Sequence, residues 1–137
     1  MKKLKIAVVG ATGNVGREIL NILDSRDFPA EKIHAVASSK SEGTKITYGN
    51  DKEIIVEALD KFKFDGIDLV LSSPGSKISE KFVPKAVKNG AKLVLIGPKV
   101  SPWSDLASLN ITHMPGHEIE LLEKLKSKRT KESKELA

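Results

Sequence analysis

The sequence predicts an α/β fold with a mostly parallel β-sheet, and three observations support this prediction. Short apolar segments without polar–apolar alternation, of which residues 6–9 are the first, are typical of parallel strands buried on both faces. Segments with helical periodicity, at residues 15–24 and 77–89, separate these strands along the chain. Turns that contain glycine or proline lie between the segments. Strands that alternate with helices pair in parallel through right-handed crossovers, which place helices on both faces of the sheet.

The first strand leads directly into a glycine motif, Gly-Ala-Thr-Gly-Asn-Val-Gly, at residues 10–16. Gly10 permits a tight turn out of the strand, Gly13 lets the backbone approach a pyrophosphate, and Gly16 lets the following helix pack against the strand. The N-terminus of that helix offers unpaired N–H groups and the positive end of the helix dipole to a phosphate. The motif therefore predicts a dinucleotide-binding turn, and a glycine turn of another kind of α/β domain is the alternative.

The first helix, predicted over residues 15–24, has a broad apolar face that includes Leu20 and Leu23. Asn14 occupies the expected position of an N-cap, where its side chain accepts a hydrogen bond from a helix N–H group. Pro29 ends the element, because proline disfavours the helical conformation in the residue before it. We expect Phe28 to be a core side chain.

The second strand, predicted over residues 33–38, is followed by the polar turn Ser38-Ser39-Lys40-Ser41. An NAD site often has an acidic residue about 20 residues after the glycine motif, which binds the ribose 2′-hydroxyl. Hydroxyl groups and an ammonium suit a 2′-phosphate instead, and the first carboxylate, Glu42, comes only after them. The turn therefore predicts NADP rather than NAD, and an ordinary polar turn is the alternative.

Residues 45–48 and 53–57 predict two strands joined by a hairpin turn, and residues 68–72 predict another buried strand. The next helix, at 77–89, contains Pro84, which we expect to divide it into two pieces, and Gly90 ends it. Residues 92–96 predict a further strand. The order strand–helix–strand–hairpin–strand–helix–strand is the first half of a doubly wound, Rossmann-like sheet.

The loop after residues 68–72 reads Ser73-Pro74-Gly75-Ser76. Folds of this class hold their ligands at the carboxyl ends of parallel strands, where this loop lies. Ser73, Gly75 and Ser76 are therefore candidates to contact the nicotinamide half of the cofactor, although turn chemistry explains all three residues equally well.

Four segments together resemble the aspartate-semialdehyde dehydrogenase family, specifically its N-terminal NADP-binding part. The segments are residues 10–18, 27–29, 35–41 and 73–76, and the resemblance extends over residues 1–96. It implies that the turn at residues 12–15 and the serine-rich loop at 38–41 hold NADP. The residues expected to bind the cofactor are Gly10, Thr12, Gly13, Asn14, Val15, Ser38, Ser39, Lys40, Ser41, Ser73 and Gly75. The family commonly has arginine in place of Lys40 and alanine in place of Pro74; lysine keeps the charge but lacks the planar fork of arginine.

The resemblance also implies a reaction, the NADPH-dependent reduction of an aspartyl phosphate to aspartate semialdehyde. This oxidoreductase step belongs to amino-acid biosynthesis, including that of lysine. The family forms a thioester on a catalytic cysteine, and the sequence contains no cysteine. We therefore assign no catalytic residue and expect the chain to be inactive by itself.

The resemblance ends after Ile96, where the family continues into an Asp-Asn-Ser-Ser segment that this chain lacks. We expect an NADP-binding domain at residues 1–97 and a divergent tail at residues 98–137, partly disordered, with a short helix at 118–125. The chain is thus expected to be a truncated or divergent relative. A shifted reading frame beyond codon 96 is a hypothesis that accounts for the abrupt loss of pattern.

The net charge of +5 does not by itself indicate nucleic-acid binding, because aromatic and basic residues are not interleaved. No window contains the roughly 18 apolar residues that a membrane span needs, and we expect neither a signal peptide nor a membrane partner. These features predict a cytoplasmic protein. His113 and His117 are four residues apart, but Pro115 and Gly116 prevent a helix between them, so we expect no metal site.

Two other functions stay open at this point. The chain could be a non-catalytic NADP-binding or regulatory module that forms a homodimer or pairs with a full-length subunit. It could also be a small reductase of the short-chain type, because Tyr48 and Lys52 have the Tyr-x-x-x-Lys spacing of that class. The predicted turn between Tyr48 and Lys52 argues against the second possibility, since the pair normally shares a helical face.

Overall fold

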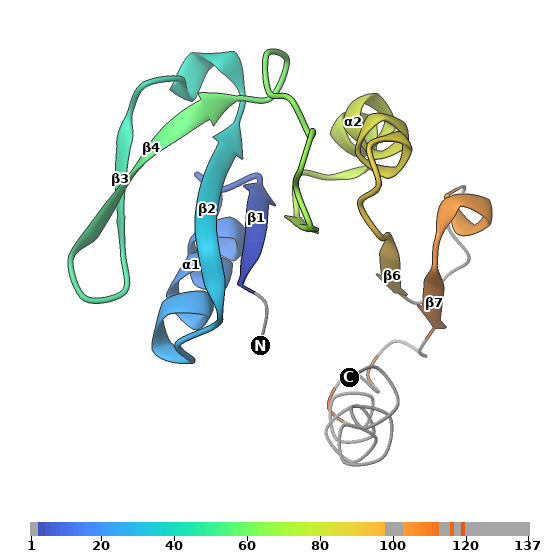
Figure 1. Ribbon diagram of the computed structural model, residues 1–137, viewed down its shortest axis with the longest axis horizontal. Coiled ribbons are helices and arrows are strands. Elements are labelled where there is room, and N and C mark those ends of the chain that lie inside the picture. Colours follow the sequence, from blue (N-terminus) through green and yellow to red (C-terminus); the bar gives the residue numbers. More distant parts are fainter. Residues whose placement is uncertain (1–2, 98–102, 113–115, 117–118, 120–137) are drawn as a thin grey trace. The chain divides into compact units, whose positions relative to one another are not determined.

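The computed structural model describes residues 3–97, 103–112, 116 and 119 (Figure 1). The chain divides into two compact units, Met1–Lys92 and Leu93–Ala137, and each is described by itself. The domain boundary expected after residue 97 stays a prediction.

The first unit is built on a five-stranded sheet with the order β3-β4-β2-β1-β5. Its strands are β1 (Leu4–Val9), β2 (Ala30–Ala37), β3 (Lys45–Tyr48), β4 (Lys52–Ala58) and β5 (Leu69–Ser72). β1 pairs in parallel with both β2 and β5, β2 pairs in parallel with β4, and β3 is antiparallel to β4. The predicted mostly parallel, Rossmann-like α/β fold is therefore confirmed.

The first helix, α1 (Asn14–Ser25), begins one residue earlier than predicted. Its N-cap is Gly13, with extended backbone angles and no side-chain capping bond, so the expectation that Asn14 caps the helix was wrong. The reason lies in the turn: the Gly13 carbonyl accepts the Arg17 N–H at 2.9 Å, which starts the helical bonding at Gly13. Asn14 is thereby the first helical residue rather than the residue before the helix.

The second helix, α2 (Ser76–Lys88), runs without a break through Pro84, so the predicted division into two pieces was wrong. Proline inside a helix costs about 3 kcal/mol, because it removes a hydrogen bond and crowds the preceding turn. Phe82, Val83 and Ala86 are buried on both sides of Pro84. Burying a side chain such as Phe or Val contributes about 1.5–3 kcal/mol each, which is enough to offset the proline.

Gly90 ends α2 as predicted, in a left-handed conformation with φ of 92°. Its N–H donates to the Val87 carbonyl at 2.9 Å, and the Ala91 N–H donates to the Ala86 carbonyl at 3.1 Å. These two bonds form a Schellman motif, which satisfies carbonyls that the end of the helix leaves unpaired.

One cluster of buried apolar side chains lies between α1 and the sheet. Leu20 and Leu23 of α1 belong to the same buried cluster as Ile6 and Val8 of β1. Gly16 makes this close approach possible, because a Cβ atom there would overlap the Gly10 carbonyl oxygen and lie 2.7 Å from the Ala11 Cα. The role predicted for Gly16, close packing of the helix against the strand, is confirmed.

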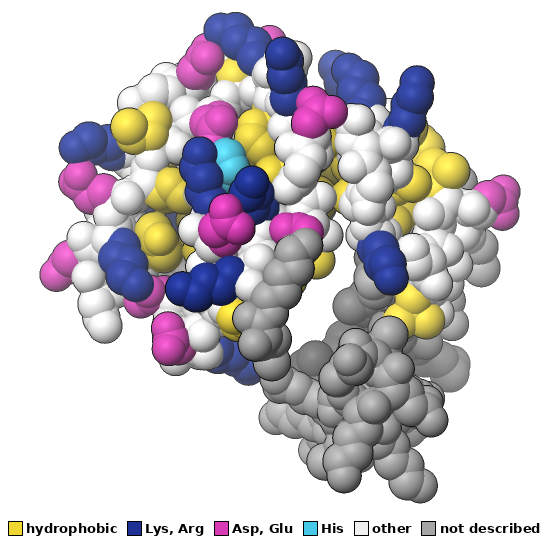
Figure 2. Space-filling view, in the orientation of Figure 1, with side chains coloured by type: hydrophobic (Ala, Val, Ile, Leu, Met, Phe, Trp, Pro, Cys, Tyr) yellow, Lys and Arg dark blue, Asp and Glu magenta, His cyan; other side chains and the backbone are white. Residues whose placement is uncertain are grey.

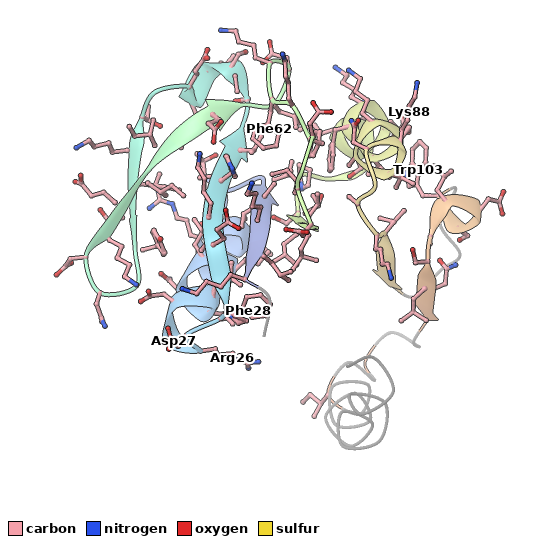
Figure 3. All side chains as sticks on the ribbon, in the orientation of Figure 1. Arg26, Asp27, Phe28, Phe62, Lys88 and Trp103 are labelled. Carbon is pink, nitrogen blue, oxygen red and sulfur yellow. The ribbon has the colours of Figure 1, made fainter. Side chains whose placement is uncertain are left out.

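Phe28 is not the core side chain that the sequence suggested, since 37% of it is exposed. It lies in the turn between α1 and β2, where Asp27 takes a left-handed conformation with φ of 45°. Figure 3 shows Asp27 and Phe28 together at the end of α1. The turn directs the chain toward β2 and leaves the ring at the surface.

The last turns of α1 hold the tip of the β3–β4 hairpin, through contacts that we call the hairpin anchor. The Asn21 amide oxygen accepts the Gly49 N–H at 2.9 Å. The Asp24 carboxylate accepts the Asn50 N–H at 3.3 Å and is bound by the Lys52 ammonium. The hydrogen bond from Lys52 lowers the pKa of Asp24, and the same bond raises the pKa of Lys52.

The second unit contains β6 (Val94–Gly97), the short helix η2 (Ser104–Leu106) and β7 (Leu109–Thr112). β6 was expected to continue the main sheet, but it pairs in parallel with β7 in a separate two-stranded sheet. β7 was not predicted from the sequence; it supplies β6 with the hydrogen-bonding partner that an edge strand needs. The helix predicted at residues 118–125 lies outside the described residues, apart from Ile119.

Candidate functional site

A cleft opens at the carboxyl ends of four strands of the first unit. β2 and β4 lie on one side of β1 in the sheet, and β5 lies on the other side. The direction in which strands are added therefore reverses between β1 and β5. Open α/β sheets bind their ligands at such a switch point. The cleft has a volume of about 610 Å³. It is lined by Val9, Gly10, Thr12, Gly13, Ala37, Ser38, Ser39, Leu59, Asp60, Phe62, Phe64, Ser73, Pro74, Ile78, Lys81, Phe82 and Lys85.

The glycine turn is held between its two neighbouring strands. The N–H groups of Gly10 and Ala11 both donate to the Val36 carbonyl of β2, at 2.8 and 3.2 Å. On the other side, a Cβ at Gly10 would lie 3.2 Å from the Ser73 Oγ, and Gly10 has a φ of 86°. Gly10 is therefore required by its left-handed conformation and by the close approach of the loop after β5.

Gly13 differs from the other two glycines of the motif. Its N–H donates to the Gly10 carbonyl at 3.0 Å, which closes the turn. A Cβ at Gly13 would meet only the Gly10 oxygen, at an ordinary 3.4 Å. Packing within the fold thus explains Gly10 and Gly16 but not Gly13, whose missing side chain leaves space beside the start of α1 and the cleft.

The serine-rich loop after β2 forms a short 3₁₀ helix, η1 (Ser39–Ser41). The Ser41 N–H donates to the Ser38 carbonyl at 2.9 Å, and the Thr44 hydroxyl donates to the Ser41 carbonyl at 2.7 Å. Ser38 and Ser39 line the cleft, whereas Lys40 and Ser41 do not. Glu42, the first carboxylate after β2, is engaged by the Lys61 ammonium at 2.7 Å.

The loop after β5 forms the opposite edge of the glycine turn. The Ser73 N–H donates to the Val9 carbonyl at 3.0 Å, which continues the β1–β5 pairing by one residue. Ser73 and Pro74 line the cleft. Gly75 has a φ of 82° and is the N-cap of α2, outside the cleft lining.

Residues 5–97, which include these loops, match the family described as "Semialdehyde dehydrogenase, NAD binding domain". The chain belongs to this family. It is similar to the aspartate-semialdehyde dehydrogenase of Rickettsia bellii (47% identity over 93 residues) and to that of Campylobacter jejuni (44% over 94 residues). Each match covers 68% of this chain and 27% of the relative.

Solved structures give the same assignment. A probable aspartate-semialdehyde dehydrogenase from Pseudomonas aeruginosa matches with a TM-score of 0.66 and 30% identity, over 74% of this chain and 30% of that one. Aspartate semialdehyde dehydrogenase II from Vibrio cholerae matches with a TM-score of 0.63 and 31% identity, over 69% and 28% of the two chains. The chain therefore spans less than a third of the length of these relatives, and the resemblance to the dehydrogenase family is confirmed over this part.

The semialdehyde dehydrogenase cleft brings together residues from all three predicted loops. Six of the expected cofactor residues line it: Gly10, Thr12, Gly13, Ser38, Ser39 and Ser73. The other five, Asn14, Val15, Lys40, Ser41 and Gly75, lie in the same loops but outside the lining. Contact of either group with a cofactor stays a prediction.

The far wall of the cleft was not predicted from the sequence. This wall consists of the segment after β4 and one face of α2, and its residues are Leu59, Asp60, Phe62, Phe64, Ile78, Lys81, Phe82 and Lys85. Phe62 contacts Phe64 edge-on, with ring centroids 5.0 Å apart, and Phe64 stacks on Phe82 at 5.8 Å. The spacing of residues 78, 81, 82 and 85 is that of one helix face, a signal that the sequence did contain.

Tyr48 and Lys52, the possible short-chain reductase pair, face each other across the β3–β4 hairpin. They line a second cavity of about 380 Å³ together with Asp24, apart from the residues of the glycine-turn cleft. Lys52 is bound by Asp24 there. Lys52 is therefore part of the hairpin anchor, and neither residue of the pair lines the candidate cofactor site.

Other features of the described residues bear on partners. On the face shown in Figure 2, acidic and basic side chains are interspersed. Within the described ranges, the helices are too short and too polar to cross a membrane. Those ranges also contain no group of three metal-ligating side chains, and His113 and His117 lie outside them.

Proposed function

We propose that this chain binds NADP(H) as the cofactor-binding part of an aspartate-semialdehyde dehydrogenase-like protein. The observation that carries the proposal is Gly13, the one glycine of the motif that internal packing does not require. It lies beside the N-terminus of α1 and lines the cleft. A pyrophosphate at this position would meet helix N–H groups and the positive end of the helix dipole without a side chain in the way.

The preference for NADP over NAD rests on the loop after β2. Ser38 and Ser39, whose side chains carry hydroxyl groups, line the cleft in the region where an NAD site often presents a carboxylate. Glu42, the nearest acidic residue after them in the sequence, is held by Lys61. The nearby carboxylate is thus neutralised by a partner, which favours a phosphorylated ribose over a bare one.

The reaction of the full-length family would be the NADPH-dependent reduction of an aspartyl phosphate. The relatives named above are aspartate-semialdehyde dehydrogenases, and this chain covers about 27% of their length. The thioester step of the family requires a thiolate, and the sequence has no cysteine. We therefore propose that the chain binds the cofactor without turning it over.

A calorimetric titration of the purified chain with NADPH and NADH tests this proposal, together with thermal melting at saturating nucleotide. We expect NADPH to bind more tightly than NADH and to raise Tm by mass action. NADP-dependent oxidation of aspartate semialdehyde by the chain alone would contradict the expected inactivity. Failure of both nucleotides to bind would contradict the proposed function itself.

A further inference from the structure

The positive charge that lines the cleft comes from α2 and not from the serine-rich loop. Lys81 and Lys85 lie one helical turn apart and both line the cleft. The buried Phe82 between them fixes which face of α2 is turned to the cleft. Lys40, the cation that the sequence pointed to, is exposed and lies outside the lining.

Lys81 and Lys85 have no carboxylate partner within the described part of the chain, in contrast to other lysines of the first unit. Lys45 pairs with Glu53 at 2.8 Å, and Lys61 pairs with Glu42 at 2.7 Å. Like charges at positions i and i+4 of a helix repel each other and destabilise it slightly. An anion bound in the cleft would relieve this repulsion.

One carboxylate, Asp60, also lines the cleft. It follows Leu59, whose N–H donates to the Ala37 carbonyl at 2.8 Å, so Asp60 lies close to the start of the serine-rich loop. The pKa of Lys61 is raised, chiefly by its hydrogen bond to Glu42 and to a smaller extent by the charge of Asp60. Asp60 thus interacts with the Lys61 ammonium, and the cleft lining contains two lysines of α2 against this one carboxylate.

We propose that Lys81 and Lys85 are the cationic groups that recognise the 2′-phosphate of NADP(H), in the cleft that Ser38 and Ser39 also line. This inference rests on the proposed function. The pyrophosphate is assigned to the glycine turn, so the anion left for α2 is the one that distinguishes NADP from NAD. That phosphate carries close to two negative charges at neutral pH, which suits a pair of ammonium groups.

The opposite assignment gives Asp60 the leading role. A carboxylate in the adenosine part of a dinucleotide site accepts hydrogen bonds from ribose hydroxyls and repels a 2′-phosphate, which would make the site selective for NAD. The two assignments predict opposite preferences for the unmodified chain: tighter binding of the 2′-phosphorylated fragment if the lysines dominate, and tighter binding of the unphosphorylated one if Asp60 dominates. One set of titrations therefore separates them.

The test uses two fragments that differ by the 2′-phosphate alone: adenosine 2′,5′-bisphosphate and adenosine 5′-monophosphate. The chain and its K81Q/K85Q variant are titrated with each fragment by calorimetry. We expect the double variant to bind the bisphosphate at least tenfold more weakly and the monophosphate within twofold of the unmodified chain. K81R/K85R should restore most of the bisphosphate affinity, and raised salt should weaken it in the unmodified chain.

K77Q/K88Q is the matched control. Lys77 and Lys88 lie on the same helix, α2, but neither lines the cleft. Lys88 is labelled on α2 in Figure 3. The control variant should leave both affinities unchanged, and circular dichroism should show that all variants fold. The inference is overturned if K40Q, and not K81Q/K85Q, lowers the bisphosphate affinity. It is also overturned if the unmodified chain binds both fragments equally, a result that keeps nucleotide binding intact. If neither fragment nor either dinucleotide binds, the proposed function fails as well.

Discussion

The two ends of the parallel sheet use polar groups in opposite ways. At the end that carries the hairpin anchor, Asn21 and Asp24 of α1 are occupied by Gly49, Asn50 and Lys52 of the hairpin. At the end that carries the cleft, the glycine turn, three serines and two lysines line an open cavity.

The difference separates groups that hold the fold from groups that are available to a ligand. The Asp24 side chain is only 9% exposed, and its charge is balanced by Lys52. Lys81 and Lys85 line a cavity and have no such partner among the described residues. Where polar side chains satisfy one another, their loss should change stability; where they face a cavity, their loss should change binding.

The largest effect should come from Gly16→Ala. The new Cβ would overlap the Gly10 carbonyl oxygen and crowd the Ala11 Cα, both of which are backbone atoms that cannot rotate away. We expect a loss of about 3 kcal/mol in the free energy of unfolding, at the upper end of overpacking effects. Urea denaturation measures it, and an unchanged midpoint would show that α1 is not packed against the turn as described.

Gly13→Ala should affect binding far more than stability, because its Cβ would fit at 3.4 Å from the Gly10 oxygen. Alanine is a poorer N-cap than glycine, so we expect a loss of less than about 1 kcal/mol in unfolding free energy. The affinity for NADPH should fall about 10- to 100-fold, equivalent to about 1.4–2.8 kcal/mol, because a side chain then stands where the pyrophosphate approaches. Calorimetric titration with NADPH measures the affinity of the Gly13→Ala variant, and the Gly16→Ala variant is measured in the same way for comparison. An unchanged affinity for NADPH in a folded Gly13→Ala protein would contradict the role of Gly13 on which the proposed function rests.

Gly49→Ala tests the other end of the sheet. A Cβ there would overlap the Asp24 carboxylate, and Gly49 has a left-handed φ of 56°, which alanine adopts with strain. We expect a loss of about 1–2 kcal/mol in unfolding free energy, with nucleotide affinity unchanged. Gly43→Ala is the matched control, since Gly43 also has a positive φ, of 76°, but its Cβ would meet nothing within 4 Å. Equal losses in the two variants would mean that strain alone, and not the hairpin anchor, is being measured.

The smallest effect should appear in the pH dependence of stability. The bond from Lys52 lowers the pKa of Asp24 below 3.8, so its stabilisation is present above that value and is lost as the pH falls through the folded-state pKa. The pKa of Lys52 is raised above 10.5, so its share is present below that value and is lost as the pH rises through the folded-state pKa. Thermal melting from acid to neutral pH should show a shallower acid slope for Asp24→Asn than for the unmodified chain. Identical slopes would indicate that Asp24 and Lys52 do not interact in solution.

Much of the first unit could be predicted because its signals are local. The order of strands and helices, the glycine turn and the end of α2 at Gly90 depend on residues within a few positions of one another. The periodicity of apolar residues and the positions of glycines determine the conformation of neighbouring residues, and both can be recognised in the sequence itself. The family resemblance rested on the same local segments.

The tertiary structure alone decided the features that depend on distant residues. α2 continues through Pro84 because Phe82, Val83 and Ala86 are buried, which no local preference reveals. β6 pairs with β7 and not with the main sheet, and Asp24 binds a hairpin that lies 28 residues further along the chain. The far wall of the cleft was missed for the same reason. Which face of α2 meets the cavity follows from long-range burial of apolar surface, and this term outweighs local propensity only once the chain is folded.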